Sequence, residues 1–167
     1  MGDDHSHRLR TDIDPEVKAI WDLLDEVKDP EIPVLSIWDL GVLRNVEIVN
    51  NKVIVTITPT YSACPAMDVI RSDIENVLVN SGYADSEIKT ILSPAWTTDW
   101  MTEEGKHQLE QFGIAPPVHT KSNKTSVCCP RCASENTKLI SEYGSTACKA
   151  MYQCNHCKEP FCYFKVI

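Results

Sequence analysis

Two Cys-x-x-Cys pairs near the C-terminus have the spacing of a metal site. Cys129 and Cys132 form the first pair, Cys154 and Cys157 form the second, and 21 residues separate the pairs. Two such pairs deliver four thiolates to one tetrahedral ion, most often zinc, although iron in a rubredoxin-type site takes the same ligands. The pattern therefore predicts a zinc ribbon over residues 128–167, in which the bound ion supplies folding energy that a 40-residue core lacks.

Three further cysteines of this region lie outside the two pairs. Cys128 adjoins Cys129 and competes for the place of the first ligand, but only Cys129 gives a spacing of two residues. Nothing in the spacing requires Cys148 or Cys162 to bind metal, so we expect both at core positions. The chain has eight cysteines and no apolar signal-peptide core at its start, and this combination favours metal or thiol chemistry over disulfides.

The eighth cysteine, Cys64, lies where a predicted strand meets a predicted helix. The strand is the alternating, β-branched run 53–58, which Pro59 ends, and Pro65 suits the first position of the helix that follows. Unpaired backbone N–H groups and the positive end of a helix dipole favour a thiolate at such a place. Cys64 is thus a candidate reactive thiol. The alternative is a small, buried apolar residue.

Three carboxylates, Asp29, Glu31 and Asp39, lie in an irregular segment between the first predicted helix and the first strand. Two interpretations stay open for them. They either gather near Cys64 at a common site, or they form turns and caps, for which aspartate is well suited.

The order of the predicted elements indicates an α+β fold. Apolar residues at helical or alternating spacing give helix, strand, strand, helix, strand, and the two Asn residues at 50 and 51 suit a tight hairpin turn between the first two strands. This order predicts a small sandwich with helices on one face of a three-stranded sheet. The expected elements are, in chain order, residues 15–27, 42–49, 53–58, 65–80 and 86–92.

A loop with two tryptophans, Trp96 and Trp100, follows the third strand and leads into a predicted helix, 102–112. These side chains either cover the edge of the sheet or form an exposed docking surface, since Trp is favoured at interface hot spots. The predicted organisation is a disordered tail (1–13), an α+β domain with a Trp-containing extension (14–112), a linker (113–127) and the zinc ribbon (128–167).

The charge distribution argues against nucleic acid as a partner. Residues 1–112 hold nine basic and 21 acidic side chains, a net charge of −12, whereas residues 113–167 hold seven basic and three acidic ones. An acidic body repels phosphate backbones. No apolar run has the length of a membrane span, so we expect a soluble, cytoplasmic protein that does not bind membranes.

Two family resemblances follow from these motifs. The first 92 residues or so resemble the small iron–sulfur-assembly domains of the SufT type, through Asp29-Pro30-Glu31-Ile32-Pro33, Asp39-Leu40-Gly41 and Cys64 before the helix. The chain after residue 14, apart from the linker, resembles the PaaD/PaaJ-type family of bacterial phenylacetate degradation. The runs that carry this second resemblance are 59–67, 92–101, 129–132, 142–150 and 159–161.

The second resemblance implies an accessory component of the phenylacetyl-CoA epoxidase system, a multicomponent di-iron monooxygenase with a reductase. The first implies help in assembling iron or iron–sulfur centres, with Cys64, Asp29, Glu31 and Asp39 as binding residues. Zinc, and transiently iron or an iron–sulfur cluster, are the implied cofactors. The epoxidase subunits or their assembly machinery are the implied partners, with exposed Trp96 and Trp100 as the apolar contact.

Two other functions remain as alternatives. One is a thiol-dependent enzyme with Cys64 as nucleophile, which requires a paired base such as histidine. The candidates are few: His107 in the last predicted helix and His119 in the linker, neither of which stands in a recognisable catalytic motif. The other is an electron-transfer or coupling subunit of the same complex. We expect the chain not to be catalytic alone.

Overall fold

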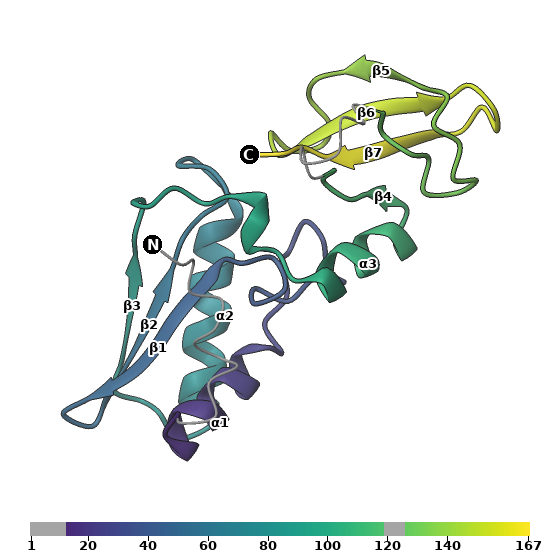
Figure 1. The fold of residues 1–167 in the computed structure, drawn as a ribbon. Coiled ribbons are helices and arrows are strands. Elements are labelled where there is room, and N and C mark those ends of the chain that lie inside the picture. Colours follow the sequence, from purple (N-terminus) through teal and green to yellow (C-terminus); the bar gives the residue numbers. More distant parts are fainter. Residues whose placement is uncertain (1–12, 119–125) are drawn as a thin grey trace. The chain divides into compact units, whose positions relative to one another are not determined.

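The chain forms two compact units that divide between Thr102 and Glu103. The computed structural model describes residues 13–118 and 126–167, and Figure 1 shows their helices and strands. The expected tail, 1–13, therefore lies outside the described residues except for Ile13. Each unit has its own sheet, so each is described by itself.

The sheet of the first unit has three strands in the order β1-β2-β3. Strands β1 (Leu43–Val49) and β2 (Lys52–Ile57) pair antiparallel, and β3 (Ser86–Thr90) adds to β2 in parallel. Asn50 and Asn51 join the first two strands with φ values of 52° and 63°, the left-handed conformations that a tight hairpin turn needs. The predicted hairpin and the predicted third strand are both present, and the parallel pairing of β3 with β2 is a finding of the structure.

Two helices pack on this sheet. Helix α1 (Pro15–Leu24) starts after Asp14, whose Oδ1 accepts a hydrogen bond from the Glu16 N–H at 2.8 Å. Helix α2 (Ala66–Asn80) runs along one face of the sheet in Figure 1. Its side chains Ile70, Ile74 and Leu78 are almost fully buried, as their helical spacing predicts. The α+β class expected from the sequence is confirmed.

The tryptophan loop is not an exposed docking surface. Trp96 is 3% exposed and donates from Nε1 to the Leu40 carbonyl at 3.0 Å, and Trp100 is 1% exposed beneath the Arg44 guanidinium, 3.4 Å from its ring centroid. A short 3-10 turn, η1 (Thr98–Trp100), folds the loop inward. The docking interpretation is therefore wrong, because both rings are used to complete the core of the first unit.

The second unit starts earlier than the sequence indicates. Helix α3 (Glu103–Gln111) belongs to it, and the segment expected to be a linker begins with a strand, β4 (Ile114–Ala115). Strands β5 (Thr137–Ser141), β6 (Lys149–Cys154) and β7 (Pro160–Phe164) follow, and the sheet order is β4-β7-β6-β5. Since β4 pairs in parallel with β7, the domain boundary lies before α3 and not at residue 112.

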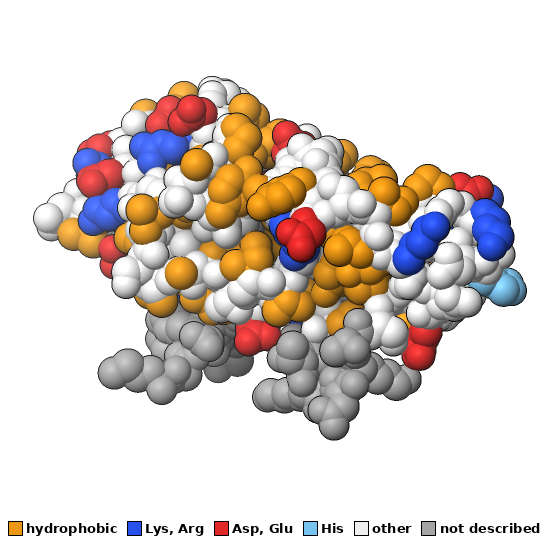
Figure 2. All heavy atoms as spheres, turned by 90° about the horizontal axis from the view of Figure 1, so that it is seen from above, with side chains coloured by type: hydrophobic (Ala, Val, Ile, Leu, Met, Phe, Trp, Pro, Cys, Tyr) orange, Lys and Arg blue, Asp and Glu red, His pale blue; other side chains and the backbone are white. Residues whose placement is uncertain are grey.

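The face that Figure 2 presents carries apolar as well as charged side chains. Over the described residues, the more exposed large apolar side chains include Leu92 (59%), Val79 (54%) and Tyr143 (68%). Among the described residues, no helix is long and apolar enough to cross a membrane.

Candidate metal centre and thiol site

The four cysteines of the two Cys-x-x-Cys pairs converge in the second unit. Their Sγ atoms all lie within 4.8 Å of one another, with 3.7 Å between Cys129 and Cys157 and 3.6 Å between Cys132 and Cys154. Four sulfurs at about 2.3 Å from a tetrahedral zinc ion stand about 3.8 Å apart. The arrangement thus fits one tetrahedral ion, and it is the one group of three or more potential ligands found among the described residues.

Two matching turns hold these sulfurs in place. The residue after each second cysteine, Ala133 or Lys158, is left-handed, with φ of 56° and 67°. Its N–H donates to the carbonyl of the first cysteine of its pair, at 2.9 Å for Cys129 and 3.0 Å for Cys154. The N–H groups of those first cysteines donate in turn to carbonyls five residues on, both at 3.0 Å. We call these two turns, at Cys129–Cys132 and Cys154–Cys157, the first and the second knuckle. Their backbones have the same conformation and the same hydrogen bonds.

Apolar side chains surround the cluster on one side. Val127, Phe161 and Ala115 form a buried core together with Cys129 and Cys154, and Tyr152 packs against it. The two-residue strand β4 contributes to this core through Ala115. Such a shell keeps water from the buried sulfurs and favours a closed, structural metal site.

The protein environment gives very different pKa values to Cys132 and Cys154, whose sulfurs lie 3.6 Å apart. Backbone N–H donors, first that of Cys157 and then that of His156, lower the pKa of Cys154 to about 6. For Cys132 the N–H of Ser134 lowers the pKa, but burial and the neighbouring cysteine sulfurs outweigh it and raise the pKa to about 12. In the absence of a bound ion, Cys154 is thus a thiolate at neutral pH, whereas Cys132 keeps its proton.

The remaining cysteines of the ribbon lie outside the cluster. Cys128 is exposed, so the structure places Cys129 and not Cys128 among the four sulfurs. Cys148 is buried, with its sulfur 3.0 Å from Thr146 Oγ1, and Cys162 is half-buried and donates to the Met151 sulfur at 3.6 Å. His156 is exposed, as expected for a residue inside a knuckle.

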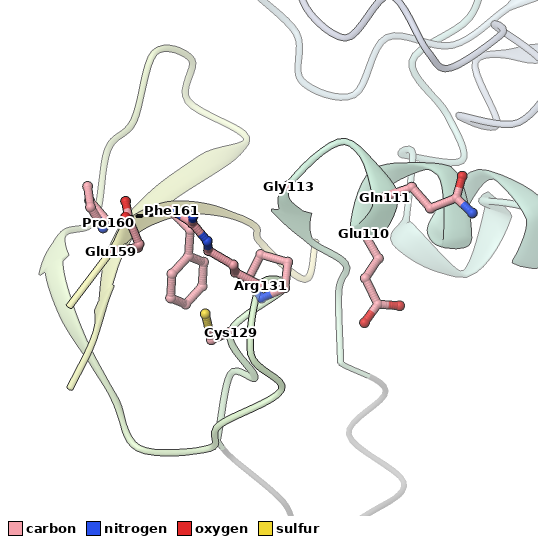
Figure 3. Close-up of a pocket in the computed structure, with 9 residues that line it drawn as sticks. Glu110, Gln111, Gly113, Cys129, Arg131, Glu159, Pro160 and Phe161 are labelled. Carbon is pink, nitrogen blue, oxygen red and sulfur yellow. Dashed lines mark ion pairs between the residues drawn. The ribbon is translucent and has the colours of Figure 1, made fainter. Parts of the chain in front are cut away.

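A pocket of about 340 Å³ lies beside the first knuckle, within the second unit. Its lining includes Cys129, Arg131, Glu159, Phe161 and, from the end of α3, Glu110. Figure 3 shows the Cys129 sulfur directed toward the Arg131 and Phe161 side chains. The sequence analysis does not predict this pocket. The opposite charges of Arg131, inside the first knuckle, and Glu159, just after the second, could have indicated it.

In the first unit, Cys64 lies at the start of α2. It is half-buried, its N–H donates to the Tyr61 carbonyl at 3.1 Å, and its carbonyl accepts from the Met67 N–H at 3.3 Å. Pro65 is the N-cap residue, and no side chain caps the helix. The strand-to-helix placement that the sequence predicts for this thiol is therefore present.

The three predicted carboxylates do not join Cys64 in a common ligand group within the described chain. Asp29 is buried and its Oδ1 accepts from the Glu31 and Ile32 N–H groups, both at 2.8 Å, which is turn and cap chemistry. Glu31 itself is exposed.

Asp39 braces the junction between the irregular segment and the tryptophan loop. Its Oδ1 accepts from the Thr102 hydroxyl at 2.6 Å, and its Oδ2 lies 2.9 Å from Ser36 Oγ. The Thr102 N–H also donates to the Asp39 carbonyl at 3.0 Å. These contacts of Asp39 are structural, and a sequence pattern alone does not reveal its distant partner.

Comparisons with known proteins define the class of each part. Residues 17–89 match the family model described as "Iron-sulfur cluster assembly protein", and residues 114–165 match the model described as "PaaD zinc beta ribbon domain". The chain thus joins a domain of the iron–sulfur-assembly type to a zinc ribbon of the PaaD type.

A full-length relative defines the family. The chain is 47% identical over 163 residues to an Escherichia coli (strain K12) protein that is named as one of the subunits of a "Putative 1,2-phenylacetyl-CoA epoxidase", covering 96% of this chain and 99% of that protein. This chain belongs to the PaaD family. The family resemblance that the sequence motifs indicate is confirmed.

Relatives of the first part alone carry a different name. A "Fe-S protein maturation auxiliary factor" of Porphyromonas gingivalis (strain ATCC BAA-308 / W83) is 37% identical over 89 residues, covering 52% of this chain and 84% of that protein. The solved structure of a DUF59 domain of unknown function from Bacillus anthracis has a TM-score of 0.52 and 29% identity, covering 56% of this chain and 90% of that chain. The fold of the first unit is therefore shared with these proteins.

Proposed function

We propose that this protein is an accessory component of a phenylacetyl-CoA epoxidase system that helps to assemble the iron or iron–sulfur centres of that system. The observation that carries the proposal is the combination of domains. One chain joins an assembly-type domain to a PaaD ribbon and matches a protein named as an epoxidase subunit along nearly its whole length. A chain of this kind acts on the metal centres of its partners without being the oxygenase itself.

Cys64 is the proposed binding residue of the first unit. Cys64 is half-buried at the start of α2, where no side chain caps the helix, and the positive end of the helix dipole stabilises a thiolate or a sulfur-bound iron group. Because Cys64 has few fixed ligands around it, the site suits transient binding of an iron group better than permanent binding. Asp29 and Asp39 support this site indirectly, by ordering the segment before β1.

The ribbon is proposed to hold one zinc ion through Cys129, Cys132, Cys154 and Cys157. The sulfur spacing fits a tetrahedral ion, and four protein ligands leave no open position for chemistry. Bound zinc stabilises the ribbon, which presents a folded surface for the proposed partner, an epoxidase subunit or its assembly machinery.

The competing function, a thiol enzyme that uses Cys64, would need a histidine base beside the thiol, and the described residues offer none in the first unit. The described part of the first unit, residues 13–102, contains no histidine. His107 is exposed in α3 of the second unit, where its Nε2 lies 2.9 Å from Gln111 Nε2. Within the described residues of the first unit no Cys–His pair of the catalytic kind is formed, and the other candidate base, His119, lies outside the described residues.

The proposal is tested by the metal content of the oxygenase. We expect oxygenase purified from cells that lack this protein to contain much less iron per subunit and to have proportionally lower activity. Supplying the wild-type chain restores both, whereas Cys64→Ala restores neither. Cys128→Ala is the matched control, because Cys128 is an exposed thiol outside both sites, and it should restore both.

Full iron loading and full activity in the absence of the chain would refute the assembly role. Normal iron loading with turnover that still requires the chain would move the function to coupling or electron transfer within the complex. Equal failure of Cys64→Ala and Cys128→Ala would remove Cys64 from the proposed site.

A further inference from the structure

The pocket beside the first knuckle has one cation. Among the residues that line it, Arg131 alone is basic, and Glu110 and Glu159 are acidic. In sequence, Arg131 lies between the two cysteines of the first pair, and Glu159 lies two residues beyond the second pair. The Arg131 guanidinium forms an ion pair of 2.7 Å with the Glu159 carboxylate. Figure 3 shows this pair across the pocket from the end of α3. The two knuckles are therefore bridged by charge as well as by their sulfurs.

The ion pair is easily exchanged. Its two side chains are 68% and 49% exposed, and exposed pairs contribute little to stability because water and salt screen them. Arginine also binds free carboxylates, so a carboxylate from solution can replace Glu159 when its concentration is high enough. Arg131 can thus change partner without disturbing the fold.

The same residues cover a metal-ligating sulfur. Cys129 lines the pocket and yet is only 2% exposed, with Phe161 and Arg131 beside it. A set of four thiolates repels anions, so a small anionic ligand needs a local cation to come near. Arg131 is that cation, and Glu159 holds it while the pocket is empty of other anions.

We propose that this pocket is an entry site for small thiols that carry a carboxylate, and that such ligands exchange the ribbon metal from the Cys129 side. The carboxylate takes Arg131 from Glu159, which places the thiolate next to Cys129. A bond forms between the incoming sulfur and the divalent ion, and the bond from Cys129 Sγ breaks. Cys129 leaves as a thiolate and takes a proton from solvent, so no electron is transferred. This inference rests on the proposed metal binding by the ribbon.

The test compares an anionic and a neutral thiol on the full-length, zinc-loaded protein. Zinc per chain is measured first, and an absence of zinc binding would defeat the proposed metal site, not the entry site alone. Zinc release is then followed with a chromogenic chelator at low salt, with 3-mercaptopropionate or 2-mercaptoethanol added. We expect Arg131→Gln to slow release by 3-mercaptopropionate about fivefold, as for the loss of one nearby charge, and not to slow release by 2-mercaptoethanol.

Glu159→Gln frees Arg131 and should speed release by 3-mercaptopropionate more than release by 2-mercaptoethanol. This arm keeps the test decisive even if Arg131→Gln loses zinc. Lys138→Gln is the matched control, because Lys138 is an exposed cation of the same unit, in β5, that does not line the pocket. Release slowed equally for both thiols by Arg131→Gln, or slowed as much by Lys138→Gln, would overturn the entry site.

Discussion

At the scale of single residues, the metal cluster links zinc binding to pH. The pKa of Cys132 is raised to about 12, so its proton is still bound at neutral pH and must leave when an ion binds. The pKa of Cys154 is lowered to about 6, so above about pH 7 its sulfur is already a thiolate and releases no proton. As the pH falls toward 6, protonation of Cys154 adds a further competing proton.

We therefore predict that zinc affinity rises with pH and that fewer than four protons are released per ion near pH 7.5. Calorimetry in two buffers of different ionisation enthalpy measures this number directly. Below about pH 6 the number should increase, because Cys154 then also carries a proton. An affinity independent of pH between 6 and 8 would contradict the assignment of these thiols as ligands.

Whether the role of a residue can be predicted from sequence depends on how far along the chain its partner lies. The four-cysteine cluster is predictable from sequence because each Cys-x-x-Cys pair forms a local turn with a fixed spacing. The cap role of Asp29 is local too, since its acceptor oxygen serves N–H groups two and three residues on. The partner of Asp39, Thr102, is 63 residues away, and the burial of Trp96 depends on a carbonyl 56 residues away. No local pattern encodes those contacts.

At the scale of elements, Gly41 fixes how the segment before β1 meets the tryptophan loop. Its φ is +77°, and a Cβ atom placed there would lie 2.6 Å from the Trp100 carbonyl oxygen. Gly82, after α2, has a similar φ of +91°, but nothing lies within 4 Å of its Cβ position. A side chain at either glycine would thus strain the backbone, but only a side chain at residue 41 would also clash with Trp100.

We predict that Gly82→Ala lowers the free energy of unfolding of the first unit by about 1–2 kcal/mol, the cost of the left-handed conformation. Gly41→Ala should lower it by about 2–5 kcal/mol, since overpacking adds to that cost. Denaturant unfolding of both variants, monitored by tryptophan fluorescence, gives the comparison. Equal losses for the two variants would show that the close approach of Trp100 does not constrain the fold.

The helices and longer strands follow from sequence, because their apolar periodicity extends over many residues. Helix α2 and the hairpin of β1 and β2 are examples. Strand β4 is missed because two residues carry no period, and two prolines follow them. Its pairing with β7 is a contact across nearly 50 residues, so the boundary of the ribbon unit appears only in three dimensions.

At the scale of the whole molecule, two units with separate sheets and cores should unfold separately. Cys154→Ser removes a ligand that is fully buried. We predict that this variant loses its zinc and that residues 128–167 lose protection from hydrogen exchange, whereas residues 14–92 keep theirs. Elemental analysis and exchange mass spectrometry check the two parts, with Cys128→Ser as the control that keeps zinc. Unchanged zinc in Cys154→Ser would refute the four-cysteine site.

The proposed function belongs to this scale as well, because it requires the assembly-type domain and the PaaD ribbon in one chain. Family membership could be predicted from the sequence, since its motifs lie in both parts. The nature of the centre in the proposed assembly role could not, because Cys64 belongs to no group of three or more potential ligands among the described residues.

The most direct measurement of the central claim is iron transfer between purified proteins. The chain is loaded anaerobically with labelled iron and sulfide and mixed with iron-free oxygenase, the two proteins are separated, and the label on the oxygenase is counted. We predict that label and activity appear together on the oxygenase, faster than from free iron, with the wild type and Cys128→Ala but not with Cys64→Ala. Transfer no faster than from free iron, or equally fast with Cys64→Ala, would contradict the assembly role of Cys64.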